Sequence, residues 1–231
     1  MSGDWPRGPA RPALPRAEVH VWRADLDAQL WPGSDGLSRE ERERAEALLR
    51  PAVADRWVAA RWALRHVLAR YLEEDPGRVA IAVDAGGKPR LADGSERLRF
   101  NLSHSGPLAL VALSAEDEVG VDVEAARADR DPLALAEQAL APADIEAVRN
   151  AAPEEQAEVF HRRWARHEAR LKCLGVGIFG GTPPVGEVAV RDLDAGSGYA
   201  AAVAIAAPEI PPRRCWTFDP GPLQKDGNRV S

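Results

Sequence analysis

Val119-Gly-Val-Asp-Val-Glu124 lies near the middle of the 231-residue chain and alternates apolar with acidic residues. Successive side chains of a β-strand point to opposite faces, so this segment predicts Asp122 and Glu124 on one face and Val121 and Val123 on the other. Alternation of this kind is also ordinary for an edge strand with one solvated face. The segment therefore predicts either a solvated sheet edge or a pair of metal-ligating carboxylates.

A later segment, Trp164-Ala-Arg-His-Glu-Ala-Arg-Leu-Lys172, supplies a third carboxylate. As a helix it places Trp164, Glu168 and Lys172 along one side. Taken alone, Glu168 and Lys172 are an ordinary i,i+4 ion pair, and Trp164 with Phe160 is typical of core packing. If this helix packs beside the acidic strand, however, three carboxylates converge. Such a donor set suits Mg²⁺ acting on a phosphate-bearing substrate.

The overall composition, 45% hydrophobic and 29% charged, is that of a globular protein. A net charge of −6 argues against a general nucleic-acid binder. Cys173 and Cys215 have no metal-ligand spacing and fit a reducing compartment. No apolar run reaches the roughly 18 residues that span a bilayer, and the first residues lack a signal peptide's apolar stretch. We expect a soluble, cytoplasmic protein without nucleic-acid or membrane partners.

The order of the expected elements repeats once along the chain. In the first half we expect strands at 18–23, 79–83, 98–102 and 108–113, and helices at 38–50, with Ser38 as N-cap, and 54–73. In the second half we expect strands at 119–124, 187–190, 199–205 and 213–218, and helices at 133–140, 142–149 and 154–174.

This repetition predicts an α+β fold of two pseudo-twofold-related subdomains, 18–117 and 118–219. Each is expected to be a small, mostly antiparallel sheet packed with helices, and the active site is expected at their interface. The Pro-rich segment 1–17 and the polar segment 220–231 are expected to be flexible tails.

Two short polar segments add candidate phosphate ligands. In Phe100-Asn-Leu-Ser-His-Ser105, the side chains of Ser103 and His104 can donate to a phosphate oxygen, although a turn at a strand end explains the same residues. Gly86-Gly-Lys-Pro89 is a tight turn that offers the ammonium group of Lys88. It lacks the glycine spacing of a P-loop.

Arginines flank the apolar stripe of the helix expected at 54–73. Arg56 and Arg61 lie on opposite edges of that stripe. Edge arginines commonly pack their stems and keep the charged head in water. A planar guanidinium group facing a cleft is equally suited to a phosphate.

Together and in this order, the segments resemble the signature of the Sfp-type 4′-phosphopantetheinyl transferases. The resemblance covers about residues 38–206 and rests on Gly87-Lys-Pro89, Phe100–Ser105, Val119–Glu124 and the pattern Phe160-x-x-x-Trp164-x-x-x-Glu168-Ala-x-x-Lys172. It implies a monomeric, pseudo-twofold α+β enzyme with coenzyme A as co-substrate. Such enzymes move the phosphopantetheine arm onto a serine of an apo acyl, aryl or peptidyl carrier protein and release adenosine 3′,5′-bisphosphate.

The resemblance also implies roles for individual residues. Asp122, Glu124 and Glu168 would hold Mg²⁺, or Mn²⁺ in its place, against the diphosphate of coenzyme A. Glu168 would be the catalytic base, and Lys172 would neutralise the diphosphate or steady a carboxylate. The implied coenzyme-binding residues are Lys88, Pro89, Ser103 and His104, together with Arg44, Arg56 and Arg61 from the first half, of which Arg44 and Arg56 would meet the 3′-phosphate.

Two residues depart from the family pattern. His167 stands where the family usually has lysine before the helix glutamate, and Glu41 stands where relatives often place a basic phosphate contact. Carrier proteins of this kind are acidic, so Arg162, Arg163 and Arg166 are candidate docking residues, with a solvated helix face as the alternative.

Two rival functions fit the same fold. One is a non-catalytic module that binds coenzyme A or a carrier protein, and the other is a Mg²⁺-dependent nucleotide hydrolase. The choice among fatty-acid, polyketide and nonribosomal-peptide carriers stays open.

Overall fold

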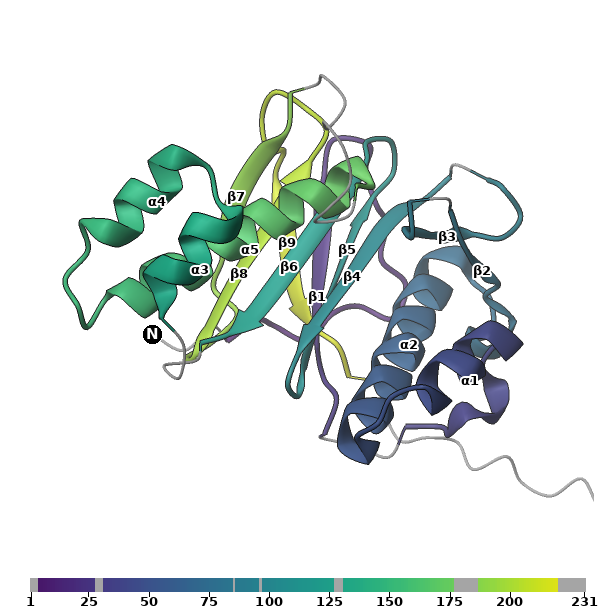
Figure 1. The fold of residues 1–231 in the computed structure, drawn as a ribbon. Helices are drawn as coiled ribbons and strands as arrows, with labels where there is room; N and C mark the ends of the chain where they lie inside the picture. The colour runs from purple at the N-terminus through teal and green to yellow at the C-terminus, as the bar shows by residue number, and fades with distance from the viewer. Residues whose placement is uncertain are drawn as a thin grey trace, which may run out of the picture.

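The computed structural model describes residues 4–27, 31–84, 86–95, 97–126, 131–176 and 187–219. Within these ranges the strands form a four-stranded, a three-stranded and a two-stranded sheet. Helices cover the outer faces of the two larger sheets (Figure 1). The predicted α+β class is confirmed, and no helix in the described ranges combines the length and apolar character that a membrane span requires.

The four-stranded sheet has the order β4-β5-β1-β9. Its strands are β1 (Val19–Asp25), β4 (Arg99–Ser105), β5 (Leu108–Ser114) and β9 (Arg213–Thr217). β5 is antiparallel to both β1 and β4, whereas β9 runs parallel to β1. Every residue of β5 is buried, as expected for a central strand covered on both faces.

The helices of the first half are α1 (Arg39–Glu46) and α2 (Pro51–Leu72), with the 3₁₀ turns η1 (Ser34–Gly36) and η2 (Pro76–Arg78) beside them. The predicted cap is confirmed, because Ser38 and Glu41 form a capping box at the start of α1. α1 ends earlier than predicted, and α2 begins at Pro51 because proline fits the first position of a helix. A short hairpin of β2 (Ile81–Val83) and β3 (Pro89–Leu91) follows.

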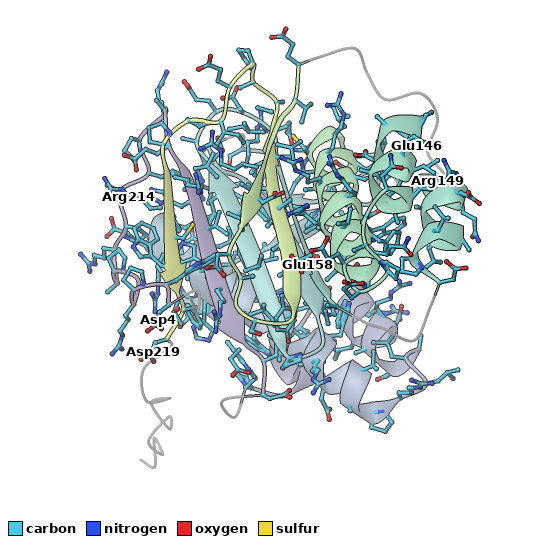
Figure 2. The ribbon with its side chains drawn as sticks, turned by 90° about the vertical axis from the view of Figure 1, so that its left-hand side faces the viewer. Asp4, Glu146, Arg149, Glu158, Arg214 and Asp219 are labelled. Carbon is cyan, nitrogen blue, oxygen red and sulfur yellow. The ribbon has the colours of Figure 1, made fainter. Side chains whose placement is uncertain are left out.

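The second half builds the three-stranded sheet β6-β8-β7. It contains β6 (Val119–Ala125), β7 (Ala189–Leu193) and β8 (Tyr199–Ile205), all antiparallel to their neighbours, and α3 (Pro132–Ala139), α4 (Pro142–Arg149) and α5 (Gln156–Leu174). Arg149 of α4 donates to Glu137 of α3 over 2.9 Å. Figure 2 shows Glu146 and Arg149 on the outer side of this helical layer, far from Arg214 at the opposite edge.

Three apolar cores order these elements into layers. α2 packs on one face of the four-stranded sheet through residues such as Leu64 and Phe100. The other face packs against the three-stranded sheet through Val21, Leu110, Val121 and their neighbours. α5 then covers the outer face of the three-stranded sheet, where Ala165, Ala169 and Cys173 meet Ala202 and Ala204. The two halves therefore stack with their helices outside, as Figure 1 shows.

The last strand does not stay with the second half, as its sequence position had suggested. β9 pairs with β1 of the first half, Trp216 lying opposite Trp22. The N-terminal segment is attached to the same strand: Gly8 N–H donates to Thr217 O over 3.1 Å, and Thr217 N–H donates to Pro6 O over 2.8 Å. Thus the described part of the segment expected as a free tail is bound to β9, while 220–231 lie outside the described residues.

Candidate active site

The halves meet where the edge strands β4 and β6 run side by side. Side-chain oxygens on β4 accept the outward N–H groups of β6: Val121 N–H donates to Asn101 Oδ1 (3.0 Å), Val123 N–H to Ser103 Oγ (3.4 Å) and Ala125 N–H to Ser105 Oγ (3.0 Å). Every second residue of β4 thus substitutes for a missing strand partner and covers the exposed edge of β6. Because these bonds recur at every second residue of both strands, they fix the alignment of β4 against β6 and therefore of one half against the other.

α5 approaches β6 at Gly120. An ideal Cβ atom on Gly120 would lie 2.1 Å from the carbonyl oxygen of Ala169 and 2.3 Å from the backbone nitrogen of Cys173. Only a residue without a side chain permits this contact between backbones. Since Gly120 lies on the same face of β6 as Asp122, the contact brings the acidic face of the strand against Glu168 and Lys172.

Asp122 is the most buried acid of the site, only 2% exposed. Its Oδ1 atom accepts from Ser103 Oγ over 2.8 Å and from Lys172 Nζ over 2.6 Å. Lys172 also donates to Ser103 Oγ over 3.0 Å. One residue from each of β4, β6 and α5 therefore meets at a single point of the seam.

Glu124 and Glu168 complete the acidic group that the sequence predicted. Burial raises the pKa of Glu124, and the charge of Asp122 raises it further, against the opposing effects of Lys172 and of hydrogen bonds from Trp164 and Ser105. Burial likewise raises the pKa of Glu168; the charge of Lys172 acts against this, and the charges of Asp122 and Glu124 act with it. The mutual repulsion places the three carboxylates in one electrostatic neighbourhood.

The donor set fits a hard divalent cation. Asp122 Oδ2 and Glu168 Oε1 are buried and have no hydrogen-bond partner, and unpaired carboxylate oxygens are the ligands that Mg²⁺ prefers. As the side chains stand, no group of three or more His, Cys, Asp or Glu residues within the described ranges converges closely enough to hold a metal ion. Asp122 and Glu168 thus each have a buried carboxylate oxygen without a partner, Glu124 accepts from Ser105, and Lys172 is bound to Asp122.

Positive charge gathers next to the acids, around His104. This ring is half-buried on β4, and burial lowers its pKa, followed by the positive charges of Lys172 and Arg61. The imidazole is therefore neutral near pH 7 and can donate one N–H. Among the predicted coenzyme-binding residues, Ser103 contacts Lys172. His104 lies on the opposite face of β4, the face that carries Phe100 and packs against α2, the helix of Arg61.

The other predicted coenzyme ligands are placed differently. Lys88 is 5% exposed, and its ammonium group donates to Glu118 (2.6 Å), Val119 O (2.9 Å) and Cys173 O (3.0 Å). All three of its N–H donors are used within the protein. The residue after it, Pro89, begins β3 and is half-buried.

Two arginines of the first half were also predicted to meet a phosphate. Arg56 forms a two-pronged ion pair with Asp27, at 2.9 and 2.6 Å, on an exposed surface. Arg44 is exposed in the last turn of α1. The structure does not bring Arg44 or Arg56 into contact with the acidic group.

The candidate docking arginines of α5 differ in their surroundings. Arg163 pairs with Asp144 over 3.1 Å and Arg166 with Asp192 over 2.8 Å, so acids of α4 and β7 neutralise both. Arg162 is exposed. His167 lies beside the Trp164 ring, and Asp144 and Arg170 are the charges that act on it. The ring therefore faces the helical layer.

Three residues contribute to the site in ways that the sequence did not predict. Trp164 was expected only as a core residue beside Phe160, yet it also lies close enough to Glu124 to act on the pKa of that carboxyl group. Its four-residue spacing from Glu168 was the available signal. Asn101 and Ser105 accept N–H groups of β6 and so fix how β4 and β6 are aligned. Their spacing of two residues is visible in the sequence as Asn-x-Ser-x-Ser.

Fold and site define an α+β protein with a buried acid–lysine group at the seam of two halves. The family model of the 4′-phosphopantetheinyl transferase superfamily matches residues 118–221. The chain is 37% identical over 183 residues to the 4′-phosphopantetheinyl transferase HetI of Nostoc sp. strain PCC 7120, covering 77% of each chain.

More distant relatives agree. The chain is 37% identical over 124 residues to the 4′-phosphopantetheinyl transferase AcpT of Escherichia coli K12, covering 52% of this chain and 58% of AcpT. It is 28% identical over 152 residues to the human L-aminoadipate-semialdehyde dehydrogenase-phosphopantetheinyl transferase, covering 62% and 49%. The chain belongs to the 4′-phosphopantetheinyl transferase superfamily, and the resemblance inferred from its motifs is confirmed at the level of this superfamily.

Proposed function

We propose that this protein is an Sfp-type, Mg²⁺-dependent enzyme that transfers the 4′-phosphopantetheine group of coenzyme A to a serine of an apo carrier protein. The second product is adenosine 3′,5′-bisphosphate. The observation that carries the proposal is the contact of Asp122 with both Lys172 and Ser103, beside Glu124 and Glu168. Membership of the family and two stacked α+β halves in one chain support it.

The chain's own residues supply the charge and the base for this reaction. Asp122, Glu124 and Glu168 would hold Mg²⁺, which when bound would offset charge on the diphosphate oxygens. Lys172 would bind a phosphate oxygen beside the acids, where it contacts Ser103, and the N–H of His104, on which the charge of Lys172 acts, would bind another.

Glu168 is the proposed base for the carrier serine. The serine oxygen forms a bond to the phosphorus that bears the pantetheine arm, and the bond from that phosphorus to the departing adenosine bisphosphate breaks. The serine proton passes to Glu168, which has a carboxylate oxygen without a hydrogen-bond partner. Burial of the site against the seam keeps bulk water away from the phosphorus.

The test is incubation of the purified protein with coenzyme A, Mg²⁺ and a panel of apo fatty-acid, polyketide and nonribosomal-peptide carriers. We expect at least one carrier to gain the mass of a phosphopantetheinyl group, and a carrier whose serine is replaced by alanine to gain none. Consumption of coenzyme A without any carrier would favour the rival hydrolase. Binding of coenzyme A or carrier without transfer would favour the non-catalytic module.

The protein is further proposed to act as a cytoplasmic monomer. The carrier is expected to dock beside α5, where Arg162 is the exposed arginine of the three candidates. Because Arg163 and Arg166 are already paired with acids, an acidic carrier must compete with Asp144 and Asp192 for them.

A further inference from the structure

Glu41 is a buried carboxylate for which the proposed transfer has so far given no role. It occupies the third position of α1 and is 8% exposed. Its Oε2 atom accepts the Ser38 N–H over 3.0 Å, which completes the capping box. A capping glutamate needs only this one contact, so burial of Glu41 between other charges requires a separate explanation.

Two guanidinium groups of α2 fill the remaining positions of this carboxylate. Arg65 donates to Oε2 over 2.7 Å and to Oε1 over 3.1 Å, and Arg61 donates through Nε to Oε1 over 2.7 Å. All four acceptor positions of Glu41 are then used. Burial acts to raise the pKa of Glu41, but the hydrogen bond from Arg65 and the charge of Arg61 outweigh it, and the pKa is lowered.

Arg61 is held by only one edge of its guanidinium group. The side chain is 11% exposed and lies over the Trp57 ring, 5.8 Å from its centroid. Its terminal nitrogens, Nη1 and Nη2, have no partner among the residues that the structure describes. Two parallel N–H donors of this kind match the oxygens of a phosphate. Neither nitrogen is among the buried unpaired side-chain atoms of the described residues, so both are open to a ligand from solvent.

The position of Arg61 indicates which phosphate it meets. His104 lies on the same face of β4 as Phe100, the face that packs against α2, which carries Arg61, and the charges of both Arg61 and Lys172 act on its ring. The charges that act on Glu168 are those of Lys172, Asp122 and Glu124. Coenzyme A carries phosphate in two places, the diphosphate and the 3′-phosphomonoester. With the diphosphate at the acids and Lys172, the 3′-phosphate remains for Arg61.

We propose that Glu41 is a positioning residue that holds Arg61 by Nε so that its terminal nitrogens face the 3′-phosphate of coenzyme A. This inference rests on the proposed transfer. Two arginines without a carboxylate between them repel each other, and Arg61 then loses its fixed orientation. With Glu41 in place, two guanidinium groups against one carboxylate leave a net positive charge for the phosphate. The acid at this position therefore does not contact the phosphate but holds the arginine that does.

The test compares coenzyme A with 3′-dephospho-coenzyme A in steady-state kinetics. Glu41→Gln keeps the cap, since glutamine also serves in a capping box, but removes the charge. We expect the KM for coenzyme A to rise on the order of tenfold or more, with kcat unchanged and the KM for dephospho-coenzyme A unchanged. Ser38→Ala is the matched control: it weakens the same cap and lowers Tm, but leaves the ratio of the two KM values at the wild-type level.

A double-mutant cycle tests whether Glu41 acts through Arg61. Arg61→Gln should raise the KM for coenzyme A selectively, and adding Glu41→Gln to it should cause no further rise. Glu41→Asp keeps the negative charge but moves it away from Arg61, so it should give the same selective rise in the KM for coenzyme A. It replaces Glu41→Gln in this test if the glutamine variant does not fold. Equal rises for both substrates, no rise at all, or full additivity with Arg61→Gln would each overturn the inference. A wild-type protein that transfers from neither substrate would remove the proposed function, and this inference with it.

Discussion

Lys172 Nζ lies 2.6 Å from Asp122 Oδ1, although fifty positions of sequence separate the two residues. The aspartate is almost fully buried, whereas the lysine side chain keeps 30% of its surface exposed. The ammonium group can therefore turn toward a phosphate while the carboxylate remains fixed by Ser103. This ion pair joins α5 to β6 and also places a positive charge beside the proposed metal-binding carboxylates.

Asp122→Asn should remove transfer activity. Asparagine has the same shape and still accepts from Ser103, but it takes one carboxylate from the metal-binding set and the counter-charge from Lys172. We expect kcat/KM to fall by at least about a hundredfold, the loss typical of even indirect changes at a metal site. The measurement is the rate of mass gain of the carrier.

Asp192→Asn is the control for this substitution. Asp192 is an exposed aspartate on β7, which β8 separates from β6, and it pairs with Arg166; exposed ion pairs contribute little to stability. This variant should keep the wild-type kcat and the wild-type KM for coenzyme A, and any change should be confined to the KM for the carrier, because Arg166 is released from its partner. Wild-type turnover by Asp122→Asn would instead disprove the metal assignment.

Gly120→Ala should separate α5 from β6. The added methyl group would meet backbone atoms of α5 that cannot rotate away, so the helix must shift as a body. Overpacking of this kind costs typically about 1–3 kcal/mol in the free energy of unfolding, and more where backbone must move. Because the shift also moves Glu168 and Lys172 from Asp122, we expect activity to fall by more than the unfolded fraction explains.

Urea unfolding and carrier modification, measured on the same preparation, check this. Gly33→Ala is the matched control, since a Cβ at Gly33 meets no atom within 4 Å and the residue has an ordinary φ of −64°. A Gly120→Ala protein with wild-type stability and activity would show that α5 does not depend on this contact.

The sequence predicted much of this arrangement because its signals are local. The alternation in Val119–Glu124 and the four-residue spacing of Trp164, Glu168 and Lys172 predicted the correct faces of a strand and a helix. The two faces meet because α5 can approach β6 closely at Gly120. A single glycine gives no repeating pattern in the sequence, so this contact could not be predicted from periodicity. The resemblance to known transferases supplied that long-range information.

Other features could not be predicted from local pattern. The pairing of β9 with β1 joins the two ends of the chain, and nothing in Arg213–Thr217 distinguishes a partner strand in one half from one in the other. Lys88 was predicted at a phosphate because it is a lysine in a glycine turn. Its actual partners, Glu118 and two backbone carbonyls, are set by tertiary packing.

Lys88→Met should therefore act on stability. Methionine fills the buried space but leaves the carbonyl groups of Val119 and Cys173 without their donor, which costs about 1–3 kcal/mol. We expect a lower midpoint of urea unfolding and an unchanged KM for coenzyme A. A many-fold rise in KM at wild-type stability would show instead that Lys88 turns to bind a phosphate during the reaction.

Divalent cations should stabilise the folded protein. Burial, and to a smaller extent repulsion from the neighbouring acids, raises the pKa values of Glu124 and Glu168, and a bound Mg²⁺ would stabilise the charged carboxylates against both effects. At a hundred times its Kd, a ligand specific for the folded state adds about 2.7 kcal/mol. Tm in MgCl₂ should exceed Tm in a chelator at matched ionic strength, and Glu168→Gln should reduce the difference. Equal Tm values for wild type in both buffers would contradict a metal site.

His20 should make stability depend on pH. It is fully buried on β1, with Nδ1 2.8 Å from the Tyr71 hydroxyl and Nε2 3.2 Å from Glu18. Burial lowers its pKa below the ordinary 6.5, and the opposing hydrogen bond and charge of Glu18 do not restore it. The folded state therefore binds this proton less readily than the unfolded state. The contribution to stability is present above pH 6.5 and is lost as pH falls from there toward the lowered pKa.

The free energy of unfolding, measured in urea at pH 7.5 and 5.5, tests this prediction. Between these values one histidine with a strongly lowered pKa accounts for up to about 1.4 kcal/mol. His66, His104 and His167 have lowered pKa values too and act in the same direction, so the wild-type loss alone does not isolate His20. In His20→Gln, the free energy of unfolding should differ less between pH 7.5 and pH 5.5 than it does in wild type. The reduction equals the contribution of His20 and does not depend on the variant's absolute stability. An unchanged difference would mean that His20 is protonated to the same extent in the folded and unfolded chains, against the burial that the structure gives it.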